Sequence, residues 1–351
     1  KFLRTAHTKA ESSASAVTLS GCCSKETCLR PGGTVVSRVR IGIALAVWGS
    51  ASALASPAPF PPAPEHISGA TTYLYKEAGA SKLPIYVFQP TESAGEPTPS
   101  PTVKRAAVLY FHGSGWESGT VLQYAGHARL LASHGVTTAL VEYRIKTLYG
   151  ATPFESVADA KSAIRWMRAH AEQFGVDPRR IVAAGGSAGA HIALAAAVFT
   201  DRFDESTDDR AISARPDALI LMAPIVDTTE TGYKDGVPLF GGRARELSPV
   251  HHLSAGLPPT LVLLGTGDRW ISLESVERFQ RRALSLGAVC EVVLFEGRSH
   301  HFYNHPDYFE LRPNLKKQDT STDFVPSFYV IERFLFEQGF VAEPPRMVFL
   351  P

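Results

Sequence analysis

Ser187 stands in a run of small residues, Gly185-Gly186-Ser187-Ala188-Gly189, whose types and spacing suit acyl transfer. The segment IVAA precedes this run and the Ala-rich segment AGAHIALAAAV follows the serine, as a strand and a helix would. A serine on such a tight strand-to-helix turn projects its hydroxyl outward, and only small neighbours fit. We predict that Ser187 is a nucleophile and that the amide of Ala188, at the helix N-terminus, faces an oxyanion. The competing interpretation is a glycine-rich turn that only packs the helix on the strand.

A serine nucleophile needs a base to take its proton and an acid to orient that base. Two candidates follow apolar strands downstream: Asp268 after TLVLLG and His300 after EVVLFEG. Since neighbouring parallel strands end at one edge of a sheet, both side chains are expected near Ser187. We predict that His300 is the general base and then the general acid, and that Asp268 holds its tautomer. Three weaker alternatives lie at the same strand ends: His301 for the base, and Asp227 or Glu296 for the acid.

The segment His112-Gly113-Ser114-Gly115-Trp116 directly follows the apolar strand AAVLYF. Glycine lets the backbone approach a substrate without obstruction by a Cβ atom. The amides of Gly113, Ser114 and Gly115 are therefore predicted oxyanion donors, together with that of Ala188. His112 precedes the serine in the chain and is expected to orient this loop and not to act as the base.

Composition excludes several classes of protein. The chain has 351 residues, 44% of them hydrophobic, and a formal net charge of +1. This charge gives no reason to expect nucleic acid or an anionic membrane as a partner, and no apolar stretch reaches the length of a membrane-spanning helix, so no stable membrane insertion is expected. The histidines, cysteines and carboxylates show no metal-ligand spacing, and we expect neither a metal nor another cofactor.

The N-terminal region differs from the rest of the chain. Arg38 and Arg40 precede a short apolar run, and Ala53-Leu54-Ala55 matches the small-x-small pattern of signal peptidase sites. We predict a signal peptide over 35–55, cleavage after Ala55 and a secreted or periplasmic protein. Residues 1–34 are expected to be a disordered leader or spurious upstream sequence, and 56–351 to be one catalytic domain. The competing interpretation of the apolar run is a helix packed on the domain.

Strand and helix patterns alternate over most of the chain. An opening hairpin is expected, then apolar strands, at 71–76, 83–88, 106–111, 136–143, 180–184, 218–222, 260–264 and 289–295. Helices are expected at 121–133, 153–174, 188–199, 273–286 and 323–338. This alternation predicts an α/β fold with a mostly parallel central sheet and helices on both faces. The charged segment 201–216 is expected to be a solvated loop, and the insertion 227–256 a small lid or cap.

These motifs together resemble the hormone-sensitive-lipase-like and acetyl-esterase-like α/β hydrolases, from about Pro61 to Gly339. In that family the oxyanion loop is His-Gly-Gly-Gly-Trp, and the histidine loop is often Gly-x-x-His-Gly-Phe-Phe. The resemblance implies the α/β-hydrolase fold and ester hydrolysis, and it favours His300 over His301 as the base. Two residues depart from the pattern: Ser114 and His301 each replace a glycine.

The function predicted from these residues is hydrolysis of short-chain carboxylic esters through an acyl-enzyme, including acetyl esters of carbohydrates. The substrate is expected to be a small or polymer-linked ester, and the oligomeric state is left open. Alternatives are an amidase, formamidase or peptidase with the same triad, and an inactive hydrolase fold used for binding. Aromatic and imidazole side chains near the strand ends are candidates for the pocket wall, with core packing as the alternative: Trp116, Tyr143, Trp270, His301, Phe302 and Tyr303.

Overall fold

The computed structural model describes residues 62–90, 105–311 and 322–345. The predicted leader, signal peptide and cleavage site at Ala55 lie outside the described residues. Within the described ranges, no helix is both long and apolar enough to cross a bilayer.

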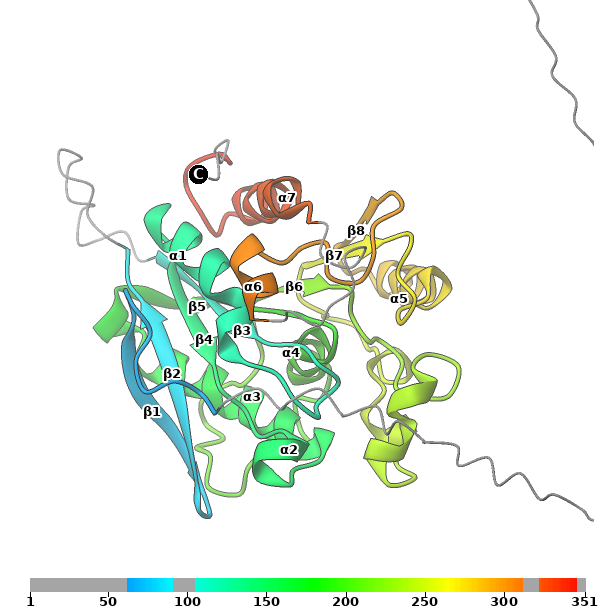
Figure 1. Ribbon diagram of the computed structural model, residues 1–351, viewed down its shortest axis with the longest axis horizontal. Helices are drawn as coiled ribbons and strands as arrows, with labels where there is room; N and C mark the ends of the chain where they lie inside the picture. The colour runs from blue at the N-terminus through cyan, green and yellow to red at the C-terminus, as the bar shows by residue number, and fades with distance from the viewer. Residues whose placement is uncertain (1–61, 91–104, 312–321, 346–351) are drawn as a thin grey trace, which may run out of the picture. The chain divides into compact units, whose positions relative to one another are not determined.

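A central sheet of eight strands carries the fold (Figure 1). Its order is β1-β2-β4-β3-β5-β6-β7-β8; β1 pairs antiparallel with β2 and β2 with β4, and the remaining pairs are parallel. The strands are β1 Thr71–Ala78, β2 Ser81–Phe88, β3 Arg105–Phe111, β4 Thr137–Val141, β5 Val176–Gly186, β6 Ala218–Met222, β7 Thr260–Gly265 and β8 Cys290–Phe295. The expected mostly parallel sheet with an opening hairpin is confirmed, and the order places the carboxyl ends of β3, β5, β6, β7 and β8 along one edge.

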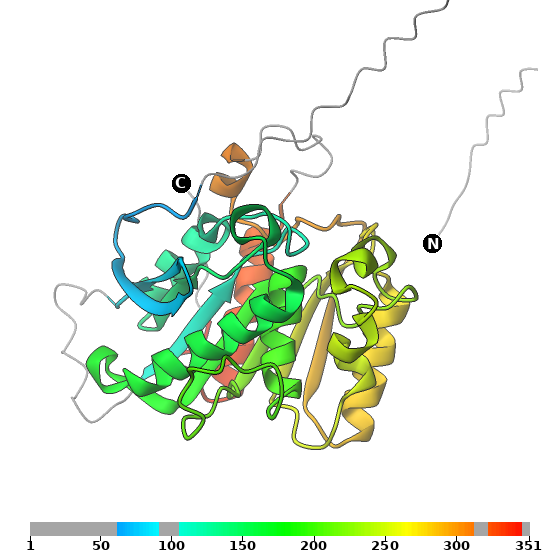
Figure 2. The same ribbon diagram turned by 90° about the horizontal axis from the view of Figure 1, so that it is seen from below.

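Helices cover both faces of this sheet, as Figures 1 and 2 show. On one face α3 packs against α4, and both contact β5; on the other, rings of α1 and α7 meet at His127 and Phe324. The α-helices are α1 Ala125–Ser133, α2 Lys146–Tyr149, α3 Pro153–Ala169, α4 Ala188–Val198, α5 Leu273–Ser285, α6 Pro306–Glu310 and α7 Phe324–Glu337. The short helices α2 and α6 were not expected from the sequence, because neither is long enough to show a helical period.

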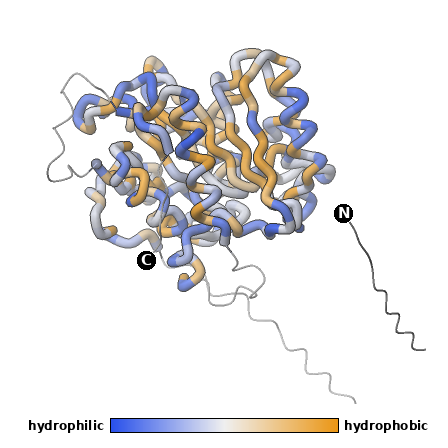
Figure 3. Tube along the Cα trace, turned by 90° about the horizontal axis from the view of Figure 1, so that it is seen from above, coloured by the Kyte–Doolittle hydropathy of each residue, from blue (hydrophilic) through white to orange (hydrophobic). Residues whose placement is uncertain are grey.

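The hydrophobic residues concentrate in the strands of the sheet (Figure 3). All residues of α4 from Ala188 to Ala197 are buried. The small alanine side chains explain this, since they let the helix lie close to β3, β5 and β6. A buried helix therefore begins directly after the candidate nucleophile.

The inserted segment 227–256 contains three 3₁₀ helices: η3 Lys234–Phe240, η4 Ala244–Leu247 and η5 Pro249–His251. Two further 3₁₀ helices are η1 Val121–Tyr124, before α1, and η2 Glu172–Phe174, after α3. The helix expected at 153–174 is thus divided, and Gly175, with a φ of 62°, ends the second part.

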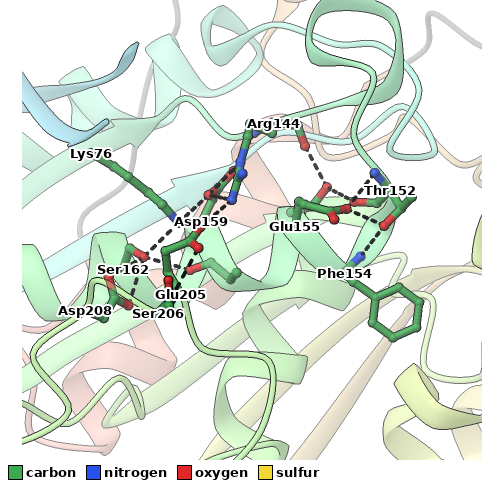
Figure 4. A network of polar contacts seen from close by, with 12 residues as sticks. Lys76, Arg144, Thr152, Phe154, Glu155, Asp159, Ser162, Glu205, Ser206 and Asp208 are labelled. Carbon is green, nitrogen blue, oxygen red and sulfur yellow. Dashed lines mark hydrogen bonds and ion pairs between the residues drawn. The ribbon is translucent and has the colours of Figure 1, made fainter. Parts of the chain in front are cut away.

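The charged segment 201–216 is the loop that its composition predicts, and half of its residues are exposed. Three of its carboxylates, those of Asp204, Glu205 and Asp208, pair with cations outside the segment, and Figure 4 shows the part around Asp159. The ammonium of Lys76 lies 2.6 Å from Asp159 and 3.0 Å from Glu205, and Arg144 contacts the same two carboxylates. Because the Lys76 and Asp159 side chains are only 4% and 0% exposed, each needs its partner. The network ties β1, the segment after β4, and α3 to 201–216.

Candidate active site

Ser187 occupies a strained turn between β5 and α4. Its φ of 55° and ψ of −120° are unusual for a residue with a side chain, and such strain concentrates at functional sites. Its N–H donates to the carbonyl of Met222 at the end of β6, at 2.9 Å. A Cβ atom on Gly189 would collide with the carbonyl of Phe111, and one on Gly185 would lie 2.7 Å from that oxygen. The glycines are therefore required because β3 and the turn pass so close to each other.

His300 and Asp268 come together at the carboxyl ends of β8 and β7. The Nδ1 atom of His300 lies 2.7 Å from Oδ2 of Asp268, and their side chains are 6% and 1% exposed. The other oxygen, Oδ1, accepts the N–H groups of Trp270 at 2.8 Å and Ile271 at 3.0 Å. These two bonds fix the carboxylate. With Nδ1 held in this way, Nε2 is the nitrogen left to exchange protons with a substrate.

The loop that carries His300 packs on the turn that carries Ser187. A Cβ atom on Gly186 would collide with the hydroxyls of Tyr303 and Tyr124. Both tyrosines are buried, so Gly186 is small because two ring hydroxyls fill the space beside it. The structure thus brings the three residues predicted as the triad to one edge of the sheet, while their catalytic roles stay predictions.

The loop after β3 has an unusual backbone. Ser114, Gly115 and Trp116 have φ values of 86°, 66° and 61°, three consecutive residues in the left-handed region. This conformation ends the extended backbone of β3 in a tight turn. On the helix side of the site, Ala188 is the first residue of α4, and an amide at that position has no acceptor within its own helix.

The prediction that the Gly113 amide is an oxyanion donor is wrong in this structure. Its N–H donates to Oε1 of Gln123 at 2.7 Å, and its carbonyl lies 3.0 Å from Nδ1 of His112. Both backbone polar groups of Gly113 are therefore occupied. Ser114, Gly115 and Ala188 remain as candidates.

His112 supports the loop 112–116, the candidate oxyanion loop, through contacts with Tyr143. Its ring stacks on Tyr143, with centroids 4.3 Å apart, and the Tyr143 hydroxyl donates to the His112 carbonyl at 2.7 Å. Burial lowers the pKa of His112 to about 4, although the hydrogen bond to Gly113 acts in the opposite direction. The ring is therefore neutral at physiological pH, in keeping with an orienting role.

The candidate pocket residues divide into two groups. Tyr143 and Phe302 are fully buried, beneath His112 and against Phe295 respectively, so the prediction that they line a substrate pocket is wrong. Tyr303 packs in the same buried layer. Trp270 is 45% exposed, and its ring lies 5.0 Å from that of His300 and 5.8 Å from that of His301. Trp270 and His301 therefore form part of the rim of the site.

Trp116 is buried, and it connects the oxyanion loop to the insertion 227–256. The centroid of its ring lies 6.0 Å from that of Tyr233 and 5.2 Å from that of Phe240, and both of these residues belong to the insertion. The Tyr233 hydroxyl lies 3.6 Å from the position that a Cβ atom would take on Gly115. Tyr233 is thus a site residue that the sequence analysis missed. The position of the insertion between the nucleophile and acid in the chain was the only signal for it.

Asp227, the alternative acid, serves another purpose. Its buried carboxylate accepts hydrogen bonds from Thr229, Thr231, Ser248 and Arg278. These bonds hold the insertion against α5. A cavity of about 130 Å³ lies elsewhere, lined by 197–198, Arg215 and 253–257 at the far end of α4 from Ser187. It has no part in the site.

Comparison with known proteins agrees with this geometry. The BD-FAE family model matches residues 98–238. The apo form of Thermogutta terrifontis esterase 2 superposes with a TM-score of 0.70 at 31% identity, covering 79% of this chain and 98% of that one.

Two curated relatives are more distant. A probable isoprenylcysteine alpha-carbonyl methylesterase of Arabidopsis thaliana is 25% identical over 65% of this chain and 50% of its own length. The probable carboxylic ester hydrolase LipM of Mycobacterium tuberculosis is 29% identical over 50% of this chain and 44% of its own. The chain thus spans about half the length of these two relatives.

The fold and the strand-end site define an α/β hydrolase. With the likeness to a solved esterase over nearly the whole of that structure, the chain belongs to the esterase family of α/β hydrolases.

Proposed function

We propose that this protein is a serine carboxylesterase that cleaves short-chain carboxylic esters through an acyl-enzyme intermediate. The observation that carries the proposal is the 2.7 Å hydrogen bond between His300 and Asp268, beside the strained turn at Ser187. A base held by a buried carboxylate, close to a serine on a strand-to-helix turn, is the arrangement that activates a hydroxyl.

In the proposed reaction, the Ser187 hydroxyl attacks the ester carbonyl and passes its proton to Nε2 of His300. Asp268 stabilises the imidazolium that forms. The amides of Ala188, Ser114 and Gly115 stabilise the oxyanion of the tetrahedral intermediate. His300 then protonates the departing alcohol, and a water molecule activated by the same histidine releases the acid and restores Ser187.

The preference for short acyl groups is supported by the surroundings of the oxyanion loop. The Tyr233 hydroxyl lies 3.6 Å from the position that a Cβ atom would take on Gly115, so this side chain limits the room beside the reacting carbonyl. Structures of the Thermogutta terrifontis esterase include a propionate-bound and a butyrate-bound form. We extend that acyl size to this chain as part of the proposal.

Hydrolysis of p-nitrophenyl esters from acetyl to decanoyl tests the proposal, with Ser187→Ala as the paired variant. We expect the highest kcat/KM with acetyl to butyryl esters, and a loss of about 10⁴-fold or more in kcat for Ser187→Ala. An intact protein that turns over no ester would contradict the proposal. Cleavage of the matching p-nitroanilide at a higher rate than the ester would favour an amidase instead.

The export of the protein is a separate proposal, supported only by the sequence pattern over 35–55. N-terminal sequencing of the protein from the extracellular or periplasmic fraction tests it. The expected first residue is Ser56.

A further inference from the structure

The oxyanion loop and the histidine loop are joined by a buried pair of side-chain amides. Gln123 lies in η1, between β3 and α1. Its Oε1 atom accepts a hydrogen bond from the Gly113 N–H at 2.7 Å. Its Nε2 donates to Oδ1 of Asn304 at 3.0 Å, across 181 residues of sequence. Gln123 is 3% exposed and Asn304 is 0% exposed. The connection is therefore inside the protein, where an unmade hydrogen bond is costly.

The chemistry of the donors determines the orientation of both amides. A backbone N–H can only donate, so Gln123 must present its oxygen to Gly113 and its nitrogen to Asn304. Asn304 must then present its oxygen to Gln123. Its own nitrogen lies 3.5 Å from Nδ1 of His301, the neighbour of His300. The polar contacts thus run in one direction, from the oxyanion loop to the residues beside the base.

Each end of this connection is itself held in place. The Gly113 carbonyl lies 3.0 Å from His112 Nδ1, and a Cβ atom on Gly113 would lie 3.4 Å from the Cβ of Ser187. At the other end, the Asn304 N–H donates to the His301 carbonyl at 3.1 Å, and the Asn304 carbonyl accepts the Thr322 hydroxyl at 2.6 Å. A movement of one loop would therefore be transmitted to the other.

We propose that Gln123 and Asn304 form a clasp that sets the distance between the oxyanion donors and His300 during acyl transfer. Both are positioning residues, and neither is expected to touch the substrate. The inference rests on the proposed esterase function. It follows from the geometry because an oxyanion hole and a base act on the same tetrahedral intermediate, and misplacement by about 1 Å costs on the order of 100-fold in rate.

Four variants and one control test the clasp. Gln123→Met and Asn304→Leu each remove the bond between the amides at similar volume, and the double variant removes both side chains. Gln123→Glu keeps an acceptor for the Gly113 N–H. The control is Gln280→Met, since the Gln280 amide donates to the Cys290 carbonyl from α5, away from the site.

We measure kcat and KM for p-nitrophenyl acetate, and urea unfolding to show that each protein is folded. We expect each single variant to lower kcat by about 10- to 100-fold with KM within about threefold of the unmodified protein. The double variant should lose no more than the worse single variant, because the clasp is already broken. Gln123→Glu should retain more activity than Gln123→Met, and Gln280→Met should keep its full kcat.

Two results would overturn the clasp: an unchanged kcat in both single variants, or losses that multiply in the double variant. The rate at which a fluorophosphonate modifies Ser187, followed by intact mass, separates this inference from the proposed function. If the unmodified protein hydrolyses no ester but is phosphonylated, and Gln123→Met slows phosphonylation, the esterase proposal fails and the clasp stands. If neither reaction occurs, both fail.

Discussion

Two sets of aspartate, serine and histidine lie near the same edge of the sheet, and they differ in which side chains meet. After β7, Asp268 contacts His300 directly at 2.7 Å. After β6, the Ser248 hydroxyl donates to Asp227 at 3.1 Å, and His251 lies 2.8 Å from that same hydroxyl but 3.8 Å from the carboxylate. In the second set the serine is in the middle, so its proton is committed to the acid and not to the imidazole.

Burial and bonding partners separate the two sets further. Ser248 is fully buried, and Ser187, on the turn between β5 and α4, is also buried but keeps 8% of its surface exposed. The Asp227 carboxylate is engaged by hydroxyls and by Arg278, while Asp268 keeps one oxygen for His300. The comparison shows that a strand-end position does not define a catalytic acid. The partner that its carboxylate oxygens bind decides the role.

The largest expected effect is on kcat, which should fall when Asp268 is replaced but not when Asp227 is replaced. Asp268→Asn should lower kcat by about 10⁴-fold, because a neutral amide cannot stabilise the imidazolium and favours the wrong tautomer. Asp227→Asn should leave kcat within about threefold, since no bond of Asp227 reaches the triad. Initial rates with p-nitrophenyl acetate measure both. Equal losses in the two variants would break the comparison.

For stability we expect the opposite order, with Asp227→Asn more damaging than Asp268→Asn. Asp227→Asn should lower the free energy of unfolding by about 1–3 kcal/mol, because buried hydroxyl donors lose a charged acceptor. The ion pair between Arg278 and Asp227 should contribute little to this difference, because the Arg278 side chain is 40% exposed and its charge is screened by solvent. Asp268→Asn keeps an oxygen for the Trp270 and Ile271 amides and should be less destabilising. Urea unfolding of both variants decides the order.

Low pH should remove the contribution of the Asp227 carboxylate to the free energy of unfolding. Burial alone would raise its pKa, but hydrogen bonds from Thr229 and Ser248 and the nearby His251 hold it below the usual value. A folded-state pKa below the unfolded one of about 3.9 means that the unfolded chain binds the proton first. The stabilisation is therefore complete above about pH 4 and is lost as pH falls through the folded pKa. The gap in unfolding free energy between the unmodified protein and Asp227→Asn should close below pH 4; a gap that widens there would contradict this.

The smallest expected effect concerns the serine of the second set. Ser248→Ala should cost about 1 kcal/mol of stability through the lost bond to Asp227, with no change in kcat. Urea unfolding and fluorophosphonate labelling, followed by peptide mapping, measure the two properties. Labelling at Ser248 in the unmodified protein would show that the second set is accessible after all.

Local patterns were sufficient to predict the strands, the turn at Ser187 and the sequence positions of Asp268 and His300. Each of these depends on a short run of residues: an apolar strand followed by a small or polar residue. The aromatic pocket was predicted poorly. Tyr143 and Trp270 have the same chemistry in sequence, and only the packed structure shows that one is buried and the other is 45% exposed.

By itself, the sequence determined the order of the elements and which residues stand at strand ends, because hydrophobic periodicity and small-residue turns are local properties. Only the tertiary structure decided which of those residues meet. It occupied the Gly113 amide with Gln123, placed Tyr233 behind the oxyanion loop, and gave Asp268 and Asp227 different partners. These outcomes depend on contacts between residues far apart in the chain, which no local pattern encodes.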